Sequence, residues 1–253
     1  MSTPHTPAHP LAGQRVVVMG GSSGIGEATA AFCAADGAEV IITGRGQDRL
    51  DAAVARLADR GGKVSGHRLD ASDRAALDAF FAGSGTVDHL IVALSGGKGA
   101  GPFAELDLAD LAAGFDGKFW PQVQVLQAAL PALRRDGSVT LVTAASARAA
   151  IPGTAGLAAI NGALEAMIPP LAVELAPLRI NAVAPGIVDT PWWDDKPAEQ
   201  RQAIFEDIAA ATPVGRVGRP EDIARALHML AANGFVTGVV LEASGGAGLS
   251  TKR

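Results

Sequence analysis

The amino-acid sequence predicts an α/β protein in which a doubly wound parallel sheet of about seven strands is flanked by helices. Two patterns support this prediction. Short runs rich in β-branched residues alternate with longer Ala- and Leu-rich amphipathic stretches, which is typical of strand–helix units with right-handed crossovers. The expected strands are also almost continuously apolar, so both faces of the sheet would be covered by helices. A single domain of the Rossmann type is therefore expected.

Seven strands are expected, at residues 15–19, 39–43, 64–69, 89–94, 139–143, 179–183 and 236–241. Seven helices are expected, at residues 24–35, 48–59, 73–81, 108–133, 155–175, 198–210 and 220–231. Pro220 and the two acidic residues after it suit the start of the last helix. Pro169 and Pro170 fall inside the helix expected at 155–175. Since a proline within a helix removes a backbone hydrogen bond, this helix is expected to bend or to end early.

The composition fits one folded domain with a large core, because 48% of the 253 residues are apolar and only 19% are charged. No linker-like segment follows Gly13, so a single domain is expected at residues 13–253. Residues 1–12 contain three prolines and no apolar stretch. They are expected to form a flexible tail, not a secretory signal.

The charge pattern and residue counts argue against several kinds of partner. The net charge is −5 and no basic block exceeds the pair Arg134–Arg135, so no nucleic-acid partner is expected. The Ala-rich runs are broken by Gly, Pro or charge before about 18 apolar residues, so no membrane span is expected and a cytoplasmic location is the default. Cys33 is the only cysteine and the five histidines are scattered, so neither an intrachain disulfide nor a metal site is expected.

A glycine-rich turn, GGSSGIG at residues 20–26, follows the first expected strand and opens the first expected helix. Glycines at such a turn let the backbone approach a diphosphate, whose charge then lies at the N-terminus of the helix. A turn that merely needs positive φ would also use glycine. Three glycines at the first strand–helix crossover favour phosphate binding. The residues expected to contact a dinucleotide here are Gly20, Ser22, Ser23, Gly24, Ile25 and Gly26.

The ends of the second and third strands bear on the adenosine half of that dinucleotide. The second strand is followed by Gly44 and Arg45, with no acidic side chain to bind the ribose hydroxyls of NAD. Because a guanidinium grips a phosphate through two hydrogen bonds, Arg45 predicts NADP(H) over NAD(H), unless it is only an exposed loop charge. Asp70 and Ala71 end the third strand and are expected at the adenine; alternatively Asp70 or Ser72 caps the next helix.

Together these motifs resemble the classical short-chain dehydrogenase/reductases, and the resemblance runs from Leu11 nearly to the C-terminus. The segments that carry it are GGSSGIG (20–26), TGR (43–45), LDASD (69–73), ALEAM (163–167), RINAVAPGIVDTP (179–191), PVGRVGRPEDIA (213–224) and FVTG (235–238). The resemblance implies a seven-stranded Rossmann domain, a nicotinamide-dependent oxidoreductase activity and assembly as a homodimer or homotetramer. It also implies that the nicotinamide end of the cofactor is held by Pro185, Gly186, Ile187 and Thr190.

The catalytic positions of that family hold other residue types in this chain. The family uses a Tyr, a Lys four residues after it, and a Ser about a dozen residues before it. Aligned on ALEAM, these positions are Leu157, Asn161 and Ala144, and the chain contains no tyrosine. The helical Asn that supports the family's lysine appears here as Lys118. The usual phenolic acid and its partner lysine are therefore missing.

Four residues are weighed for the missing chemistry. Lys118 is the first, because a desolvated ammonium can donate a proton; alternatively it is a solvated lysine on an oligomer-facing helix. Ser146 replaces the hydroxyl if the strand continues beyond Ala144, and is otherwise an ordinary loop serine. Asn161 can hydrogen-bond a ribose hydroxyl but supplies no acid–base chemistry. Lys98, in the loop SGGKGAG, either swings over a substrate or is solvated.

Ser95, Trp192 and Trp193 are the residues expected around a substrate. Ser95 follows the fourth strand, where the family has an Asn-Asn-Ala-Gly stretch. The two tryptophans lie where the family places a mobile lid. Either both indoles wall an apolar pocket, or one packs under the lid and the other at a subunit interface.

Three functions remain open. The first is an NADP(H)-dependent oxidoreductase with non-standard proton delivery, acting on a small apolar substrate of the carbonyl or alcohol type. The second is a non-catalytic NADP(H)-binding sensor or structural partner, suggested by the losses at positions 144, 157 and 161. The third is a non-redox enzyme, such as an isomerase, lyase or cyclase, that reuses the pocket.

Overall fold

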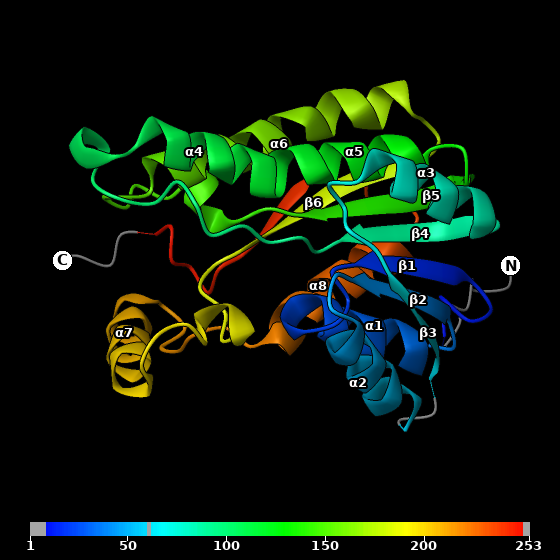
Figure 1. Cartoon of the computed structure of the whole chain (residues 1–253), viewed down its shortest axis with the longest axis horizontal. Coiled ribbons are helices and arrows are strands. Elements are labelled where there is room, and N and C mark those ends of the chain that lie inside the picture. The colour runs from blue at the N-terminus through cyan, green and yellow to red at the C-terminus, as the bar shows by residue number, and fades with distance from the viewer. Residues whose placement is uncertain (1–8, 60–61, 250–253) are drawn as a thin grey trace, which may run out of the picture.

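The computed structural model describes residues 9–59 and 62–249, and its centre is a wholly parallel seven-stranded sheet (Figure 1). The strands are ordered β3-β2-β1-β4-β5-β6-β7, so the chain winds first to one side of β1 and then to the other. The doubly wound sheet expected from the sequence is confirmed. Its strands are β1 (Arg15–Met19), β2 (Glu39–Gly44), β3 (Lys63–Arg68), β4 (Val87–Val92), β5 (Leu133–Val142), β6 (Arg179–Pro185) and β7 (Val240–Ala243).

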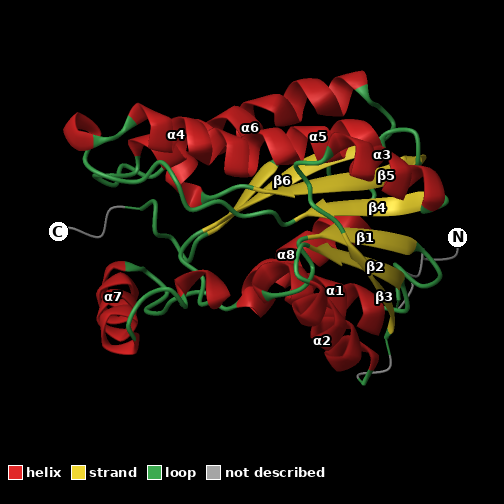
Figure 2. Cartoon of the chain, in the orientation of Figure 1, coloured by secondary structure: helices red, strands yellow, loops and turns green. Residues whose placement is uncertain are grey.

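Helices form a layer on each side of the sheet (Figure 2). On one side lie α1 (Gly24–Ala35), α2 (Gln47–Ala58) and α8 (Pro220–Ala232). On the other lie α3 (Arg74–Gly83), α4 (Leu108–Gly114), α5 (Trp120–Ala129) and α6 (Ala155–Glu174). The remaining helix, α7 (Ala198–Ala211), stands apart from both layers and contains no buried residue.

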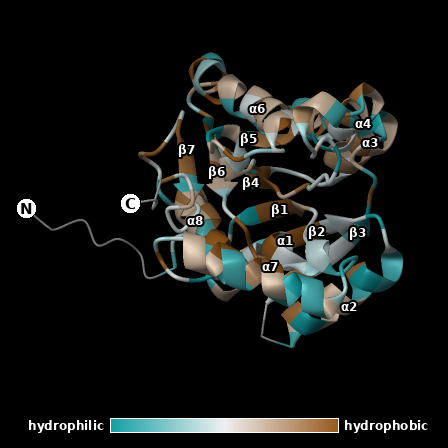
Figure 3. Cartoon of the chain, turned by 90° about the vertical axis from the view of Figure 1, so that its left-hand side faces the viewer, coloured by the Kyte–Doolittle hydropathy of each residue, from teal (hydrophilic) through white to brown (hydrophobic). Residues whose placement is uncertain are grey.

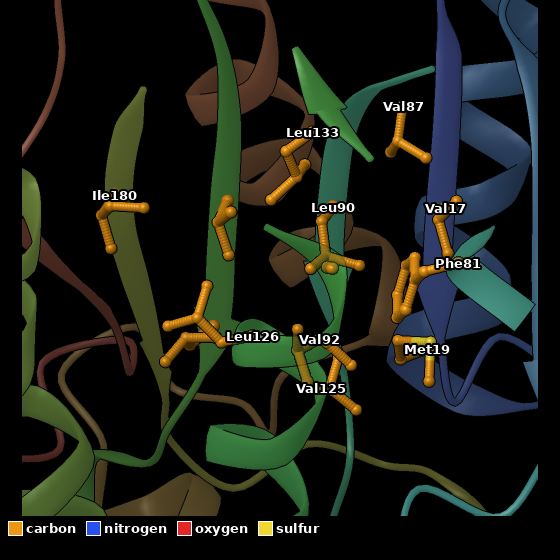
Figure 4. Packing of buried hydrophobic residues seen from close by; sticks show 14 of the residues in the cluster. Val17, Met19, Phe81, Val87, Leu90, Val92, Val125, Leu126, Leu133 and Ile180 are labelled. Atoms are coloured by element: carbon orange, nitrogen blue, oxygen red, sulfur yellow. The ribbon is translucent and has the colours of Figure 1, made fainter. Parts of the chain in front are cut away.

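The alternation of side chains along each strand divides the core into two clusters. In β1, Val16 and Val18 pack with α1, α2 and α8, whereas Val17 and Met19 pack with α3, α5 and α6. Figure 4 shows part of the second cluster, where Val17 and Met19 lie close to Phe81. The outer surface of α2 is hydrophilic while β1 is hydrophobic (Figure 3). Burial on both faces explains why the strands are almost continuously apolar.

The helix expected at 108–133 is a run of three segments. Between α4 and α5 the backbone forms a π-helical turn, Phe115–Phe119. Trp120 and Pro121 follow it as the first residues of α5. Such wider turns occur often at functional sites, and this one contains Lys118.

The expectation that Pro169 and Pro170 would bend or end their helix early is wrong for its end, because α6 continues to Glu174. Both prolines are exposed, so their rings face away from the core while Leu164 and Ile168 on the inner side are fully buried. At 20 residues, α6 is also long and apolar enough to cross a membrane by length and composition, contrary to the sequence expectation. In the fold it is a core helix, and its buried polar residues Asn161 and Glu165 bond other elements.

Several boundaries differ from the sequence expectations. The helix expected to run to residue 133 ends as α5 at Ala129, and β5 begins at Leu133, not at 139. The last strand is Val240–Ala243, not 236–241, because the preceding loop turns at Gly238, where φ is +75°. Packed structure also begins before residue 13: Leu11 is 1% exposed and its backbone N–H donates to Asp36 Oδ2 at 2.9 Å. Residues 1–8 of the expected tail lie outside the described residues.

Candidate functional site

An open cleft of about 730 Å³ lies at the carboxyl ends of the strands, where β1 separates the two directions of winding. This is the place where open α/β sheets bind ligands. Every residue proposed for a site from the sequence lines this cleft. They are Gly20, Ser22, Ser23, Gly24, Ile25, Gly26, Arg45, Asp70, Ala71, Ser95, Lys118, Ser146, Asn161, Pro185, Gly186, Ile187, Thr190, Trp192 and Trp193.

The glycine turn is shaped so that backbone groups face the cleft. Gly20 and Gly24 have φ of +77° and +53°, which only glycine adopts readily. A Cβ at Gly26 would lie 2.1 Å from the carbonyl oxygen of Gly20, so this position also requires glycine. The first turn of α1 has no side-chain cap from Ser23, which leaves its N–H groups to a ligand. The turn fits a diphosphate, as the sequence predicts.

Two arginines line the cleft beyond the end of β2. Arg45 is exposed there, and Gly44 lies so close to the Ser22 side chain that a Cβ would be 2.8 Å from Ser22 Oγ. Arg49, in the first turn of α2, is a second guanidinium that lines the cleft. Arg68 donates from Nε to the backbone oxygen of Arg45 at 3.1 Å and so holds the loop. Sequence reasoning missed Arg49, although its position four residues after Arg45 at a helix start would have indicated it.

The carboxylate at the end of β3 is held by its own turn. Asp70 Oδ1 accepts from the backbone N–H of Ser72 at 3.0 Å and from its hydroxyl at 2.8 Å, and these bonds lower the pKa of Asp70. The next helix is capped by neither residue: Asp73 Oδ1 accepts from Ala76 N–H at 3.0 Å. The interpretation of Asp70 or Ser72 as the helix cap is therefore wrong, and the Asp70 carboxylate lines the cleft.

The segment after β6 forms the opposite wall. A Cβ at Gly24 would lie 3.3 Å from the Thr190 Cβ, so Thr190 rests against the glycine turn. Gly186 lies against Ser244, which a Cβ at that position would approach to 2.9 Å. Thr190 therefore lies beside the diphosphate turn, and Pro185, Gly186 and Ile187 line the same cleft.

Lys118, Asn161 and Ser146 form one hydrogen-bonded chain at the inner end of the cleft. Lys118 Nζ donates to Asn161 Oδ1 at 2.7 Å and to the backbone oxygen of Thr143 at 3.1 Å. Asn161 Nδ2 donates to Ser146 Oγ at 3.3 Å and to the backbone oxygen of Leu157 at 2.8 Å. Lys118 is buried, and burial lowers its pKa to about 8. The alternative of a solvated Lys118 is therefore wrong.

Neighbouring residues pack around the aliphatic part of the Lys118 side chain and the turn that carries it. A Cβ at Gly96 would lie 3.2 Å from the Lys118 Cβ, so the loop after β4 packs closely against the lysine stem at this point. Gln122, fully buried one turn later, donates from Nε2 to the backbone oxygens of Leu94 and Val142. Gln122 thereby ties the π turn to the ends of β4 and β5. The sequence offered no signal for this residue beyond its helical spacing from Lys118.

A buried carboxylate lies behind this chain. Glu165 Oε1 accepts from Thr143 Oγ1 at 2.9 Å, and Oε2 accepts from Arg148 Nη2 at 2.8 Å. Arg148 Nη1 also lies 3.8 Å from Glu242 Oε2, and this ion pair links the network to β7. The charge of Glu165 raises the pKa of Lys118 and so opposes the effect of burial. Glu165 belongs to the ALEAM segment, but only the fold shows what it contacts.

The catalytic positions of the family remain without acid–base groups. Ala144 and Leu157 line the cleft and offer no hydroxyl. Lys98 also lines it, yet its Nζ is 2.9 Å from Asp110 Oδ1, and Gly99 N–H binds the same carboxylate at 2.8 Å. Lys98 is thus paired with Asp110 and its pKa is raised.

The two tryptophans divide their roles. Trp193 is buried and donates from Nε1 to the backbone oxygen of Val188 at 3.1 Å, with Phe205 of α7 against its ring. Trp192 is 48% exposed and faces Gly97 across the cleft, where a Cβ would be 3.6 Å from its Nε1. One indole therefore holds the segment before α7, and the other forms an apolar wall.

The described histidines and the cysteine lie outside the cleft. His89 is buried between Ser138 Oγ, at 2.8 Å, and Gln14 Oε1, at 2.5 Å, and burial lowers its pKa to about 4. His9 and His228 both bind Asp36. Burial raises the pKa of the Cys33 thiol to about 12. Within residues 9–59 and 62–249, no group of three His, Cys, Asp or Glu side chains is arranged to hold a metal.

Comparisons with known proteins agree with this geometry. The family model described as enoyl-(acyl carrier protein) reductase matches residues 20–248. A short-chain dehydrogenase/reductase of Stachybotrys chlorohalonatus is 28% identical over 249 residues, which cover 94% of this chain and 98% of that protein. A solved small-chain dehydrogenase in complex with NADPH is 32% identical, with a TM-score of 0.81, over 94% of this chain and all of that one. The reductase/Diels-Alderase MalC of Malbranchea aurantiaca is 26% identical, with a TM-score of 0.86, over 94% of this chain and 98% of that one.

Proposed function

The chain belongs to the classical short-chain dehydrogenase/reductase family. We propose that it is an NADP(H)-dependent reductase of a small, largely apolar substrate. In this proposal Lys118 protonates the carbonyl oxygen of the substrate. When bound, the cofactor would supply the hydride. The residues of the chain would bind the cofactor, hold the carbonyl and deliver the proton. One observation carries the proposal: among the described residues, the buried Lys118 amine at the inner end of the cleft bonds only neutral oxygen acceptors.

The preference for NADP(H) is supported by the wall beyond β2. Arg45 and Arg49 offer two guanidinium groups beside Ser22, and no carboxylate replaces Gly44 at the end of the strand. Guanidinium groups bind phosphates through paired, charge-assisted hydrogen bonds, so this wall favours a ribose that carries a 2′-phosphate. A structural relative in complex with NADPH is consistent with this choice.

The proposed proton delivery follows from the number of N–H bonds on the amine and the acceptors they meet. A protonated Lys118 has three N–H bonds, of which Asn161 Oδ1 and the Thr143 carbonyl accept two. The third is free to meet a substrate oxygen in the cleft. Ser146 accepts a hydrogen bond from Asn161, which leaves its own O–H to donate to the same oxygen. A pKa of about 8 allows Lys118 to lose and regain a proton near neutral pH.

The test compares two lysines of the same cleft. NADPH oxidation is followed with a panel of apolar ketones, enones and aldehydes for the wild type, Lys118→Met and Lys98→Met. The Lys118 variant is expected to lose turnover by ~10²–10⁴-fold, the usual contribution of a general acid, and to keep its affinity for NADPH. The Lys98 variant serves as the control and is expected to keep both. Full turnover in the Lys118 variant would refute the proposed donor.

A second function is favoured by a different observation. Ala144 and Leu157 leave the family's hydroxyl positions apolar, which suits a protein that binds NADP(H) as a sensor or structural partner without turnover. NADPH binding at micromolar or tighter concentration, with no oxidation across the panel, is the result that would select it. A non-redox use of the cleft is a further candidate, since one structural relative is a reductase/Diels-Alderase. Activity that persists without dinucleotide would select that one.

Assembly as a homodimer or homotetramer and a cytoplasmic location remain predictions. Apolar side chains are exposed on the outer helices, with Val173 of α6 at 80% and Trp120 of α5 at 50%. Covering such side chains in a subunit contact would remove apolar surface from water. Light scattering of the purified protein measures the oligomer size directly.

A further inference from the structure

The two partners of the Lys118 amine are both uncharged. They are the amide oxygen of Asn161 and the backbone oxygen of Thr143, at 2.7 and 3.1 Å. Lys98 provides the contrast, because its amine lies 2.9 Å from a carboxylate that stabilises the ammonium form and raises its pKa. Lys118 is also buried, whereas the Lys98 side chain is 65% exposed. The site of Lys118 therefore tolerates the neutral amine, and that of Lys98 does not.

Two acceptors match the neutral form of the amine. A neutral amine has two N–H bonds and one lone pair, and the two N–H bonds can go to Asn161 Oδ1 and Thr143 O. No third group among the described residues bonds Nζ, so the lone pair is left unused. The side chain lines the cleft, where a ligand can meet that lone pair. With a pKa of about 8, roughly a tenth of the molecules carry the neutral amine at pH 7 and about half at pH 8.

The surroundings favour condensation with a carbonyl compound. Leu157, Ile160 and Trp192 line the same cleft and give it apolar walls. Since imine formation releases water, apolar walls beside the amine favour the condensed form once a carbonyl compound occupies the cleft. Buried lysines with lowered pKa values are the ones that form Schiff bases in proteins.

We propose that Lys118 captures aldehydes and unhindered ketones covalently, as an imine, without any cofactor. The lone pair of Nζ attacks the carbonyl carbon, a C–N bond forms, and the π electrons of the C=O bond move to oxygen. Both N–H hydrogens are transferred to that oxygen, which leaves as water while the C=N bond forms. The electrons balance without an oxidant or reductant. The proposal shares a side chain with the proposed reductase but does not depend on hydride transfer.

The experiment uses the full chain without dinucleotide, with benzaldehyde as the carbonyl compound. Sodium cyanoborohydride at about pH 8 reduces an imine to a stable benzyl amine, and mass spectrometry of peptides then locates each benzyl group. The chain has only five lysines, so every site can be followed separately. Lys118 is expected to be modified at least ten times faster than Lys98. Modification of Lys98 or Lys63 at an equal or higher rate would overturn the proposal.

Three variants separate the chemistry from a loss of fold. Lys118→Met is expected to lose the fast modification, while Lys98→Met keeps it. Asn161→Leu keeps the lysine but removes one acceptor, and is expected to slow its modification several-fold. The rate is measured well below the thermal midpoint of the variant, so that the comparison is made between folded proteins. An unchanged rate in the Asn161 variant would contradict the role given to that contact.

The cofactor distinguishes failure of this inference from failure of the proposed function. Fast modification of Lys118 without NADPH turnover supports the imine and refutes the reductase. NADPH turnover without fast modification supports the reductase and refutes the imine. Bound NADPH is expected to slow the modification, because it fills the entrance of the same cleft.

Discussion

Lys118 Nζ lies 2.7 Å from Asn161 Oδ1, in a contact that joins the π turn after α4 to the middle of α6. The alignment on ALEAM predicts that these two residues have exchanged places relative to the pattern of the family. In this chain the amine belongs to the π turn and the amide to α6. The alignment also predicts Leu157 at the position of the family's phenol, and among the described residues no hydroxyl group bonds the amine.

The positions of Lys118 and Asn161 predict how the rate of carbonyl reduction changes when the two residues are exchanged. In the double variant Lys118→Asn with Asn161→Lys, the pair is kept and the charge moves onto α6. Carbonyl reduction is expected to fall by ~10²–10⁴-fold, because the amine no longer sits where Thr143 and Asn161 orient it. Adding Ala144→Ser and Leu157→Tyr is expected to recover activity by restoring the family's set of groups. Rates of NADPH oxidation measure both steps; unchanged activity in the double variant would show that the position of the amine is irrelevant.

The pKa of Lys118 predicts a pH dependence of reduction. A general acid works in its protonated form, so kcat/KM is expected to fall as the pH rises through about 8. In Glu165→Gln the fall is expected at lower pH, because the carboxylate that raises the pKa of Lys118 is removed. Glu242→Gln is the control, since that carboxylate lies on the far side of Arg148 and its variant should keep the wild-type profile. A shift of the profile upward in Glu165→Gln would contradict the assignment.

The arginines at the end of β2 predict the cofactor preference. Arg45→Met and Arg49→Met are each expected to weaken NADPH binding by roughly ten- to a hundred-fold, the usual worth of a charge-assisted hydrogen bond. NADH binding is expected to change little, because NADH lacks the 2′-phosphate. Arg74→Met, a surface residue paired with Asp78, serves as the control. Fluorescence titration with both dinucleotides measures the ratio of their dissociation constants. An equal loss of affinity for NADPH and NADH would argue against a 2′-phosphate bound at this wall.

Buried His89 predicts a loss of stability in acid. Burial lowers the pKa of His89 to about 4 in the folded state, whereas the unfolded chain binds the proton near the ordinary value of about 6.5. Its contribution is therefore present above pH 6.5 and is lost as the pH falls toward 4, by ~3 kcal/mol in the free energy of unfolding. His89→Gln is expected to flatten this part of the curve, and the exposed His67→Gln is expected to leave it unchanged. Urea unfolding at several pH values provides the measurement.

The sheet was predictable because each strand and helix shows its own pattern of apolar residues within a short segment of the sequence. The alternating strand and helix patterns predicted a doubly wound parallel sheet of about seven strands, and the glycines at 20, 24 and 26 indicated the turn after its first strand. The strand order itself came from the structure. The effect of Pro169 and Pro170 was mispredicted, because a single sequence does not say which side of a helix is exposed. The π turn was missed as well, since its extra residue per turn leaves no mark on the apolar pattern around Phe115–Phe119.

The sequence by itself determined two things about the site: the residues that can cradle a dinucleotide, and the lack of any tyrosine to act as its acid. Only the tertiary structure decided whether Lys118 is buried, which groups it bonds and in which direction its pKa shifts. Its partners Thr143, Asn161 and, behind them, Glu165 come from segments far apart in the chain, and the same fold pairs Lys98 with Asp110 instead. The physical reason is that a lysine's charge depends on burial and on the groups around it, and both exist only once the chain has folded.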